Sequence, residues 1–355
     1  MRFLRTLKVL YYLLTSAGPV MRGGRQMDQI FRFYVLKILQ DEGLFDYLQV
    51  KRTYGQILTE FGYVDSEYTR EVLNTLATDT HNIIQHEQNT YWRNEAQALP
   101  TLEALMQHID TRLHSFTMLA DGTTRTIPDR MRNKPVELVD SFEQDGRQLL
   151  TKFDKVLGAR VYSGMRRAAF SFLLPEERAW LKGKTLLDIG CGSGREPAEL
   201  WLLLDGDVAI TAVEPAASMI ELAQKSFPTW LNELNPGHPQ LNQNNTPTFR
   251  QGSATKLPFP DNSFDAAFWL FILHWVPDPR QAVHECVRVV KPGGVIFGAQ
   301  AFKPEINPYF DLVVRTNENC HGGFWREDYR RWFAEVGVKI DITTAAGVFR
   351  ATVPK

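Results

Sequence analysis

Residues 186–194 read Leu-Leu-Asp-Ile-Gly-Cys-Gly-Ser-Gly, an apolar segment that ends in three glycines at alternating positions. The apolar residues predict a buried β-strand. The glycines let the chain turn tightly and let its backbone approach a ligand closely. A helix is expected from residue 194, and its N-terminus would point at that ligand. The segment therefore predicts a ligand-binding turn between a strand and a helix.

Expected strands and helices alternate after this turn. The strands are expected at 185–189, 208–213, 247–251, 265–270 and 293–299, and the helices at 194–203, 216–231 and 279–290. This alternation is typical of a doubly wound parallel sheet with helices on both faces. The end of the chain departs from it, because a helix at 325–336 precedes two strands at 338–344 and 347–353 joined by Ala-Ala-Gly. Those strands predict a terminal hairpin.

Two carboxylates stand at the ends of successive strands. Asp188 precedes Gly190 by two residues and can accept a hydrogen bond from an amino group. Glu214 follows Gly194 by 20 residues, where a carboxylate can hold both hydroxyls of a ribose. Glu214 alone would also suit a helix start, where an acid favours the helix dipole. The spacing G-x-G-x-G differs from the dinucleotide pattern G-x-G-x-x-G and favours a nucleoside–amino acid cofactor without pyrophosphate.

Residues 184–298 resemble the core of class I S-adenosylmethionine-dependent methyltransferases. Three later segments carry the resemblance further, namely Gly252-Ser-Ala followed by Leu257–Asp265, Phe271-Ile-Leu-His-Trp, and Arg288-Val-Val-Lys-Pro-Gly-Gly. The resemblance implies a Rossmann-like α/β core whose mostly parallel sheet ends in an antiparallel hairpin. It also implies S-adenosyl-L-methionine as the cofactor and S-adenosyl-L-homocysteine as its product.

The resemblance and the motifs together assign the cofactor site. Its expected residues are Tyr162, Met165, Asp188, Gly190, Cys191, Gly192, Gly194, Glu214, Pro215, Met219, Ser253, Ala254 and Phe271. Met219 would cover the adenine face. Ser253 departs from the family, which usually has an acid there for the adenine amino group. A methionine at 165 would also suit the protein interior.

Segments that lie before this core in the chain resemble plant-type small-molecule O-methyltransferases. The similarity lies in Ser141-Phe-Glu-Gln-Asp-Gly, Phe153 and Tyr162-Ser-Gly-Met, since in that family an aromatic-x-x-Met element lies over the cofactor and substrate. It implies SN2 transfer of the methyl group to a hydroxyl oxygen of a small molecule, with no metal. Carbon or nitrogen methylation on the same scaffold is the alternative.

His274 is the expected catalytic residue. In the O-methyltransferase family a histidine just after the fourth strand is the general base, and imidazole titrates near neutrality. The chain continues His-Trp-Val-Pro-Asp, whereas the plant-type pattern is His-Asp-Trp. The generic core often carries a histidine here without base catalysis, so both roles stay open for His274.

The N-terminal third predicts helices followed by a hairpin. Helical spacing before Gly43, a segment 54–62, a segment 66–78 and a polar hairpin at 82–92 together resemble a winged helix. Such a module binds DNA or mediates dimerisation. Basic and acidic residues balance within residues 1–100, whereas a DNA reader presents a basic face. We therefore expect a homodimer and no nucleic acid, with a cofactor-binding winged-helix regulator as the alternative of another class.

The expected domains are a helical winged-helix-like dimerisation domain at 1–120, a connector at 121–175 that contributes to the active site, and a cofactor-binding domain at 176–355. A net charge of −1 gives no global reason to bind nucleic acid or anionic lipid. The scattered cysteines support neither a disulfide framework nor a zinc site, which favours a reducing, cytoplasmic setting. Residues 1–25 are basic and would pack as a helix or touch a membrane surface.

Residues 317–324 are interpreted as a loop that lines the acceptor pocket with Phe302, Phe310 and Trp325. Glu318, Cys320 and His321 within it match no metal-ligand spacing, so no metal is expected.

Overall fold

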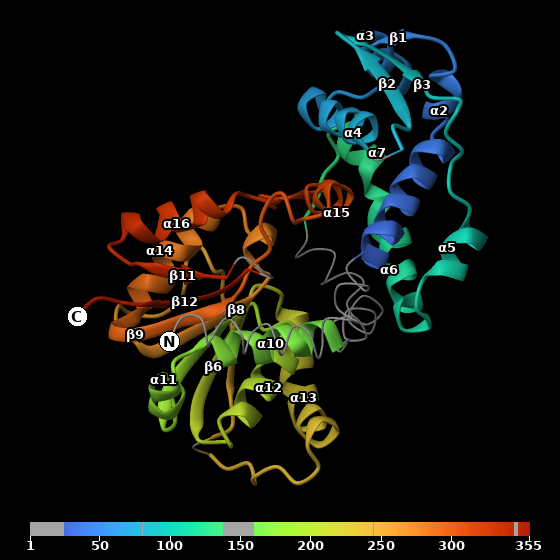
Figure 1. Ribbon diagram of the computed structural model, residues 1–355. Coiled ribbons are helices and arrows are strands. Elements are labelled where there is room, and N and C mark those ends of the chain that lie inside the picture. Colours follow the sequence, from blue (N-terminus) through green and yellow to red (C-terminus); the bar gives the residue numbers. More distant parts are fainter. Residues whose placement is uncertain (1–24, 80, 138–159, 244, 344–346) are drawn as a thin grey trace. The chain divides into compact units, whose positions relative to one another are not determined.

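The computed structural model describes residues 25–355 except residues 80, 138–159, 244 and 344–346 (Figure 1). The described chain forms two compact units. The core unit contains residues 160–305 and 323–355, and the helical unit contains 25–137 and 306–322. Residues 1–24 of the basic N-terminal segment and the motifs at 141–153 lie outside the described residues.

A seven-stranded sheet forms the centre of the core unit. Its order is β11-β12-β9-β8-β5-β6-β7. The bounds are β5 (Lys184–Ile189), β6 (Val208–Glu214), β7 (Thr248–Gln251), β8 (Phe264–Leu270), β9 (Val290–Ala299), β11 (Ile340–Ile342) and β12 (Val348–Thr352). Strands β5 to β9 pair in parallel, whereas β12 pairs antiparallel with both β9 and β11. The predicted parallel sheet and terminal hairpin are confirmed.

Helices cover both faces of this sheet (Figure 1). One layer contains α10 (Arg160–Phe172), α12 (Arg195–Leu203) and α13 (Ala217–Leu234), and the other contains α14 (Pro279–Val289) and α16 (Arg326–Glu335). A short helix α11 (Pro175–Trp180) leads into β5. Successive residues of a strand point to opposite faces. Phe268 accordingly packs into the core beneath α10 and α12, whereas Trp269 packs on Phe333 and Phe349 on the other side.

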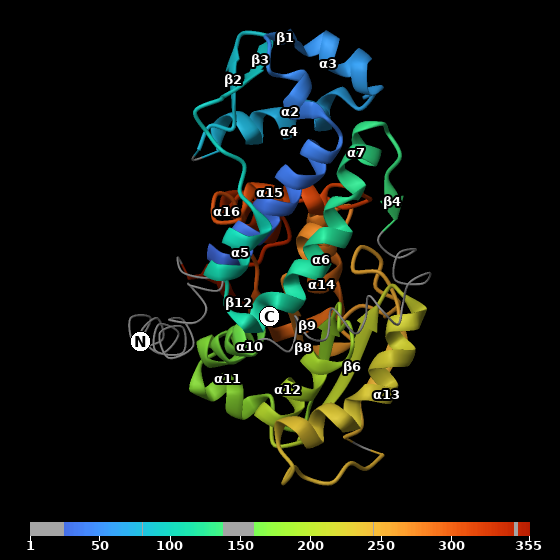
Figure 2. The same cartoon turned by 90° about the vertical axis from the view of Figure 1, so that its right-hand side faces the viewer.

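The helical unit begins with a long helix at 25–41, and Figure 2 shows α3 and a small sheet gathered at one end of it. The other helices are α2 (Leu44–Tyr47), α3 (Tyr54–Phe61), α4 (Ser66–Thr78), α5 (Leu102–His108), α6 (His114–Thr124) and α7 (Thr126–Met131). The sheet joins β1 (Arg52–Thr53), β3 (Thr90–Arg93) and β2 (Ile84–Glu87), all antiparallel. The predicted helices and hairpin are therefore present.

Sequence signals explain where these helices begin. The Thr53 hydroxyl accepts a hydrogen bond from the Gln56 amide, and the Gln56 side chain accepts one from the Thr53 amide, a capping box that starts α3. Asp65 caps α4 through the amide of Tyr68.

Residues 306–322 leave the core unit and pack within the helical unit. They form α15 (Pro308–Val314) and β10 (Asn317–Glu318), and β10 pairs in parallel with β4 (Val136–Glu137). The interpretation of residues 317–324 entirely as a loop is therefore wrong at its start. A two-residue strand has no periodicity, and its partner lies far away in the sequence. Phe310 packs on Phe31 with ring centroids 5.1 Å apart.

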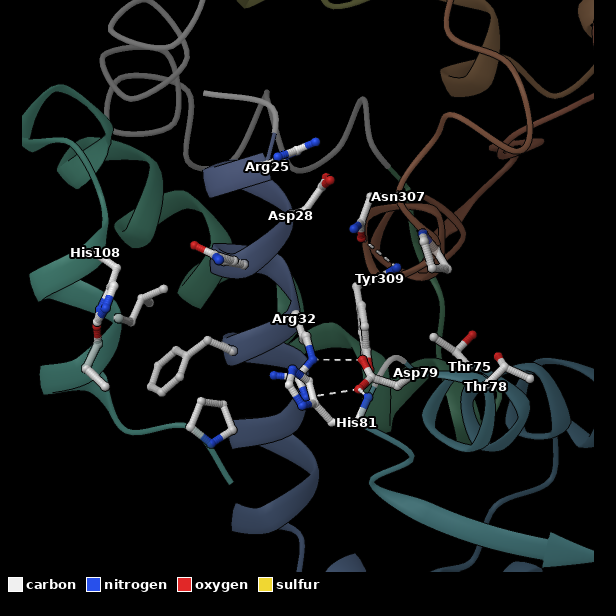
Figure 3. Close-up of a pocket in the computed structure, with 16 residues that line it drawn as sticks. Arg25, Asp28, Arg32, Thr75, Thr78, Asp79, His81, His108, Asn307 and Tyr309 are labelled. Carbon is white, nitrogen blue, oxygen red and sulfur yellow. Dashed lines mark hydrogen bonds and ion pairs between the residues drawn. The ribbon is translucent and has the colours of Figure 1, made fainter. Parts of the chain in front are cut away.

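Asp79 fastens this returning segment to the helical unit. Its carboxylate accepts hydrogen bonds from Arg32 at 2.7 and 3.0 Å and from the Tyr309 hydroxyl at 2.6 Å (Figure 3). Burial acts to raise the pKa of Asp79, but the hydrogen bonds from Arg32 and Tyr309 hold it below its usual value. These residues line a cavity of about 610 Å³ between the helix at 25–41, α4, α5 and the start of α15.

We expect Asp79→Ala to lower the free energy of unfolding by about 3 kcal/mol, because it leaves the partly buried Arg32 and the buried Tyr309 hydroxyl unpaired. Urea denaturation measures this change. Asp41→Ala is the matched control, since Asp41 pairs with Lys37 on an exposed surface and should cost well under about 1 kcal/mol. Equal effects of the two substitutions would contradict the role of Asp79 in holding residues 306–322 to the helical unit.

Candidate cofactor and active site

The glycine loop is held against the neighbouring strand by its own backbone. The amides of Gly190 and Cys191 both donate to the carbonyl of Val213, at 2.8 and 3.0 Å. Gly194 has φ of 86°, and a Cβ there would lie 2.9 Å from the carbonyl oxygen of Ala223 on α13. The position therefore requires glycine both for its backbone conformation and for space.

The parallel topology collects the predicted site residues at one edge of the sheet. β5 lies between β6 and β8, so the carboxyl ends of these strands meet there. Asp188 is near the end of β5, Glu214 ends β6, and Phe271 follows β8. Ligands of open α/β sheets bind in the crevice at this edge. The edge is therefore the candidate cofactor site.

Asp188 is buried without full hydrogen bonding. It is 1% exposed, and its Oδ2 atom has no hydrogen-bond partner among the described residues. Burial raises its pKa well above the usual value, and the nearby Glu196 carboxylate raises it further. Leaving a buried acceptor unpaired costs about 1–3 kcal/mol. An amino group of a bound ligand would satisfy this atom, as expected for the methionine part of S-adenosyl-L-methionine.

Glu214 is oriented by the loop itself. Its Oε2 atom accepts a hydrogen bond from the Gly192 amide at 3.2 Å. Burial raises the pKa of Glu214 to about 7, although backbone hydrogen bonds from Gly192 and Ala216 oppose the rise. A carboxylate fixed at a strand end beside the glycine loop fits the two hydroxyls of a ribose.

Residues expected near the adenine lie after β6 and β7. Met219 on α13 is 2% exposed, and Pro215 before it is exposed. The Ser253 hydroxyl lies 2.9 Å from the hydroxyl of Thr255, and Ala254 packs in the core with Leu257. These hydroxyls are the polar groups that this segment offers to an adenine amino group.

The segment after β8 lies directly against the glycine loop. Phe271 has φ of 55°, and a methyl carbon of Ile272 lies 2.6 Å from where a Cβ on Gly190 would be. The ring of Phe271 meets the ring of Tyr162 on α10 edge to face, with centroids 5.9 Å apart. Met165, one turn further along α10, is buried in the same core cluster as Cys191. The structure thus brings the aromatic-x-x-Met element to the cofactor edge.

His274 lies in the single turn η2 (Leu273–Trp275) and is 3% exposed. Burial lowers its pKa to about 3, so the ring is neutral near pH 7. The Gln300 side chain stands beside it, with Nε2 of Gln300 3.3 Å from Nδ1 of His274. Gln300 is fully buried at the end of β9.

The sequence interpretation missed four polar residues beside this site, namely Arg166, Glu196, Glu199 and Gln300. Arg166 is fully buried and donates to Glu196 at 2.6 Å and to Glu199 at 2.8 and 3.0 Å. The sequence did contain a signal for the two glutamates. Glu196 and Glu199 lie one turn apart in the helix just after the last glycine, so their side chains share one face of it. Nothing in the sequence identified Arg166 as their partner.

Comparison with known proteins agrees with this geometry. Residues 187–298 match the family described as Methyltransferase domain. The chain is 34% identical over 122 residues to demethylmenaquinone methyltransferase of Desulfitobacterium hafniense, covering 34% of this chain and 44% of that protein. It is 31% identical over 143 residues to O-methyltransferase rstn1 of Aspergillus nomiae, covering 40% and 58%. The chain thus spans about half the length of the curated relatives it matches.

The fold is similar over almost the whole chain to a solved structure, that of the CurJ carbon methyltransferase. The TM-score is 0.72 at 15% identity, with 99% of this chain and 97% of that chain covered. The matches of residues 187–298 show a class I S-adenosylmethionine-dependent methyltransferase domain, whose cofactor is S-adenosyl-L-methionine. Among the described residues, no helix is long and apolar enough to cross a membrane.

We expect the affinity for S-adenosylhomocysteine to rise about tenfold between pH 6 and pH 8. A raised Glu214 pKa of about 7 means that the carboxyl is mostly protonated at pH 6 and mostly ionised at pH 8. Only the carboxylate accepts from both ribose hydroxyls, so binding releases a proton below pH 7. Titration calorimetry in two buffers measures both effects. Glu214→Gln should bind S-adenosylhomocysteine weakly, and its affinity should not change with pH near 7. A wild-type affinity that stays constant between pH 6 and pH 8 would contradict the assignment of Glu214 to the ribose.

Proposed function

We propose that the whole protein transfers the methyl group of S-adenosyl-L-methionine to an acceptor carbon that lies next to a carbonyl group. The observation that carries the proposal is the hydrogen bonding of Gln300 to His274. It bears on whether the histidine takes a proton or donates a hydrogen bond.

The Gln300 amide is fixed in one orientation. Its Oε1 accepts from the Leu273 amide at 3.2 Å, and its Nε2 donates to the Ala301 carbonyl at 3.2 Å. Backbone amides only donate and carbonyls only accept, so the two ends cannot be exchanged. The NH₂ group of Gln300 therefore faces Nδ1 of His274 and donates to it, which leaves the ring proton on Nε2.

A neutral imidazole in this tautomer is a hydrogen-bond donor through Nε2. Its remaining lone pair, on Nδ1, is already engaged by Gln300. Such a ring stabilises negative charge that develops on a carbonyl oxygen better than it removes a proton from a hydroxyl. An acceptor activated by a carbonyl needs this kind of help, because its enolate places charge on that oxygen while its carbon attacks.

When bound, S-adenosyl-L-methionine supplies a sulfonium methyl group, whose bond to sulfur breaks as the acceptor carbon bonds to it. The acceptor loses one proton in exchange, released to solvent. The residues of this chain position the two partners and exclude water around them, which accounts for much of the rate of such transfers. The whole-chain similarity to the CurJ carbon methyltransferase supports this choice of acceptor class.

Oxygen methylation, with His274 as general base, is the second candidate. The similarity to O-methyltransferase rstn1 favours it. It requires Nδ1 protonated and Nε2 free to take a proton, the opposite tautomer from the one that Gln300 holds.

A direct test uses S-adenosylmethionine with a ¹³C-labelled methyl group and two acceptor panels, β-keto thioesters and phenols. Carbon-13 NMR separates methyl groups bound to carbon from those bound to oxygen. We expect labelled product from the β-keto thioesters with the methyl group on carbon. Turnover confined to phenols, with the methyl group on oxygen, would contradict the proposal.

We expect Gln300→Glu to lower kcat at least tenfold. A carboxylate beside Nδ1 would draw the ring proton to that atom and remove the Nε2 donor. Thermal unfolding checks that the variant is folded, and Gln281→Glu, on the exposed side of α14, is the matched control. An increase in kcat would show that His274 acts as a base.

The lowered pKa of His274 predicts the pH dependence of the wild-type enzyme. With a His274 pKa of about 3, the ring stays neutral from pH 5 to pH 8. The profile of kcat should therefore show no acidic limb from histidine near pH 6.5. A limb there that disappears in His274→Ala would assign a titrating base to the ring.

A further inference from the structure

Beside the cofactor site, Arg166 and the acids around it form a buried charged cluster. Arg166 on α10 binds Glu199 through two parallel hydrogen bonds and Glu196 through a third, while its guanidinium also interacts with Asp188. Arg166 is fully buried, and both glutamates are 5% exposed. The cluster joins α10 to the first turns of α12, directly after the glycine loop.

The two glutamates differ in how fully they are satisfied. Both oxygens of Glu199 are engaged, by Arg166 and, for one of them, by the Ser163 hydroxyl at 3.1 Å. Glu196 uses Oε1 for Arg166, whereas its Oε2 is buried and has no hydrogen-bond partner in the described part of the chain. Buried carboxylate oxygens are normally paired, so this atom needs a partner that the described residues do not supply.

Glu196 lies close to the other unpaired acceptor of the site. Its charge acts on Asp188, whose Oδ2 is also buried and unpartnered among the described residues, and on Tyr162 of the aromatic element. Two buried acceptors at one place suit a cation with several N–H donors, since an ammonium has three. The repulsion between the two carboxylates would fall once such a cation lay between them.

We infer that Glu196 is a cofactor-binding residue that shares the α-ammonium group of S-adenosylmethionine with Asp188, while Arg166 holds Glu196 in place. Arg166 is a positioning residue in this arrangement, because it binds the carboxylates of Glu196 and Glu199. The inference concerns the methyl donor alone and does not depend on which acceptor atom is methylated.

Two ligands separate this role from a general effect on the fold. S-adenosylhomocysteine carries the amino acid, whereas 5′-methylthioadenosine has the same nucleoside and sulfur without it. Glu196→Gln keeps an oxygen for Arg166 but removes the charge. We expect titration calorimetry to show at least tenfold weaker binding of S-adenosylhomocysteine and less than a twofold change for 5′-methylthioadenosine.

Glu199→Gln is the matched control, one turn along the same helix and bound to the same arginine. It should lower the thermal unfolding temperature and leave the ratio of the two affinities unchanged. If Glu196→Gln does not fold, Glu196→Asp keeps the charge while withdrawing it by one methylene, and the same selective loss is expected. Unchanged binding of S-adenosylhomocysteine, or a parallel loss for both ligands, would overturn the inference.

Discussion

The carbonyl of Val213 accepts two hydrogen bonds from the glycine loop, and the geometry of the cofactor site depends on them. They hold the start of the loop against the end of β6, so that Asp188 and Glu214 lie at the same edge of the sheet. The loop in turn brings the amide of Gly192 to Glu214 and the first turn of α12 to Arg166. A side chain at Gly194 would displace α13, because its Cβ would collide with Ala223.

The site divides by charge into two parts. The part that would bind the methyl donor is rich in buried acids. Among the described residues, one oxygen of Asp188 and one of Glu196 have no hydrogen-bond partner, and these oxygens suit a cationic ligand group. The side after β8 is neutral, with His274 and Gln300 buried and hydrogen-bonded to each other. This separation of charge suits a reaction in which a cationic methyl donor meets an uncharged or enolising methyl acceptor. In such a reaction the main task of the protein is to position the two reactants.

The core sheet could be predicted from the sequence because its signals are local. Each parallel strand is an apolar run followed by a helix, and the glycines and Glu214 are spaced by the geometry of one β-α-β unit. The excursion of residues 306–322 could not be predicted, since the contacts of Tyr309 with Asp79 and of β10 with β4 join distant parts of the chain. The same limit applies to Arg166 and Gln300, whose roles come from partners 26 or more residues away.

The edge formed by β5, β6 and β8 should hold S-adenosylmethionine. A crystal structure of the protein with S-adenosylhomocysteine tests it most directly. We expect one ligand per chain at this edge, with its ribose hydroxyls on Glu214 and its amino group on Asp188. Ligand bound elsewhere, or an empty edge at a saturating concentration of S-adenosylhomocysteine, would contradict it.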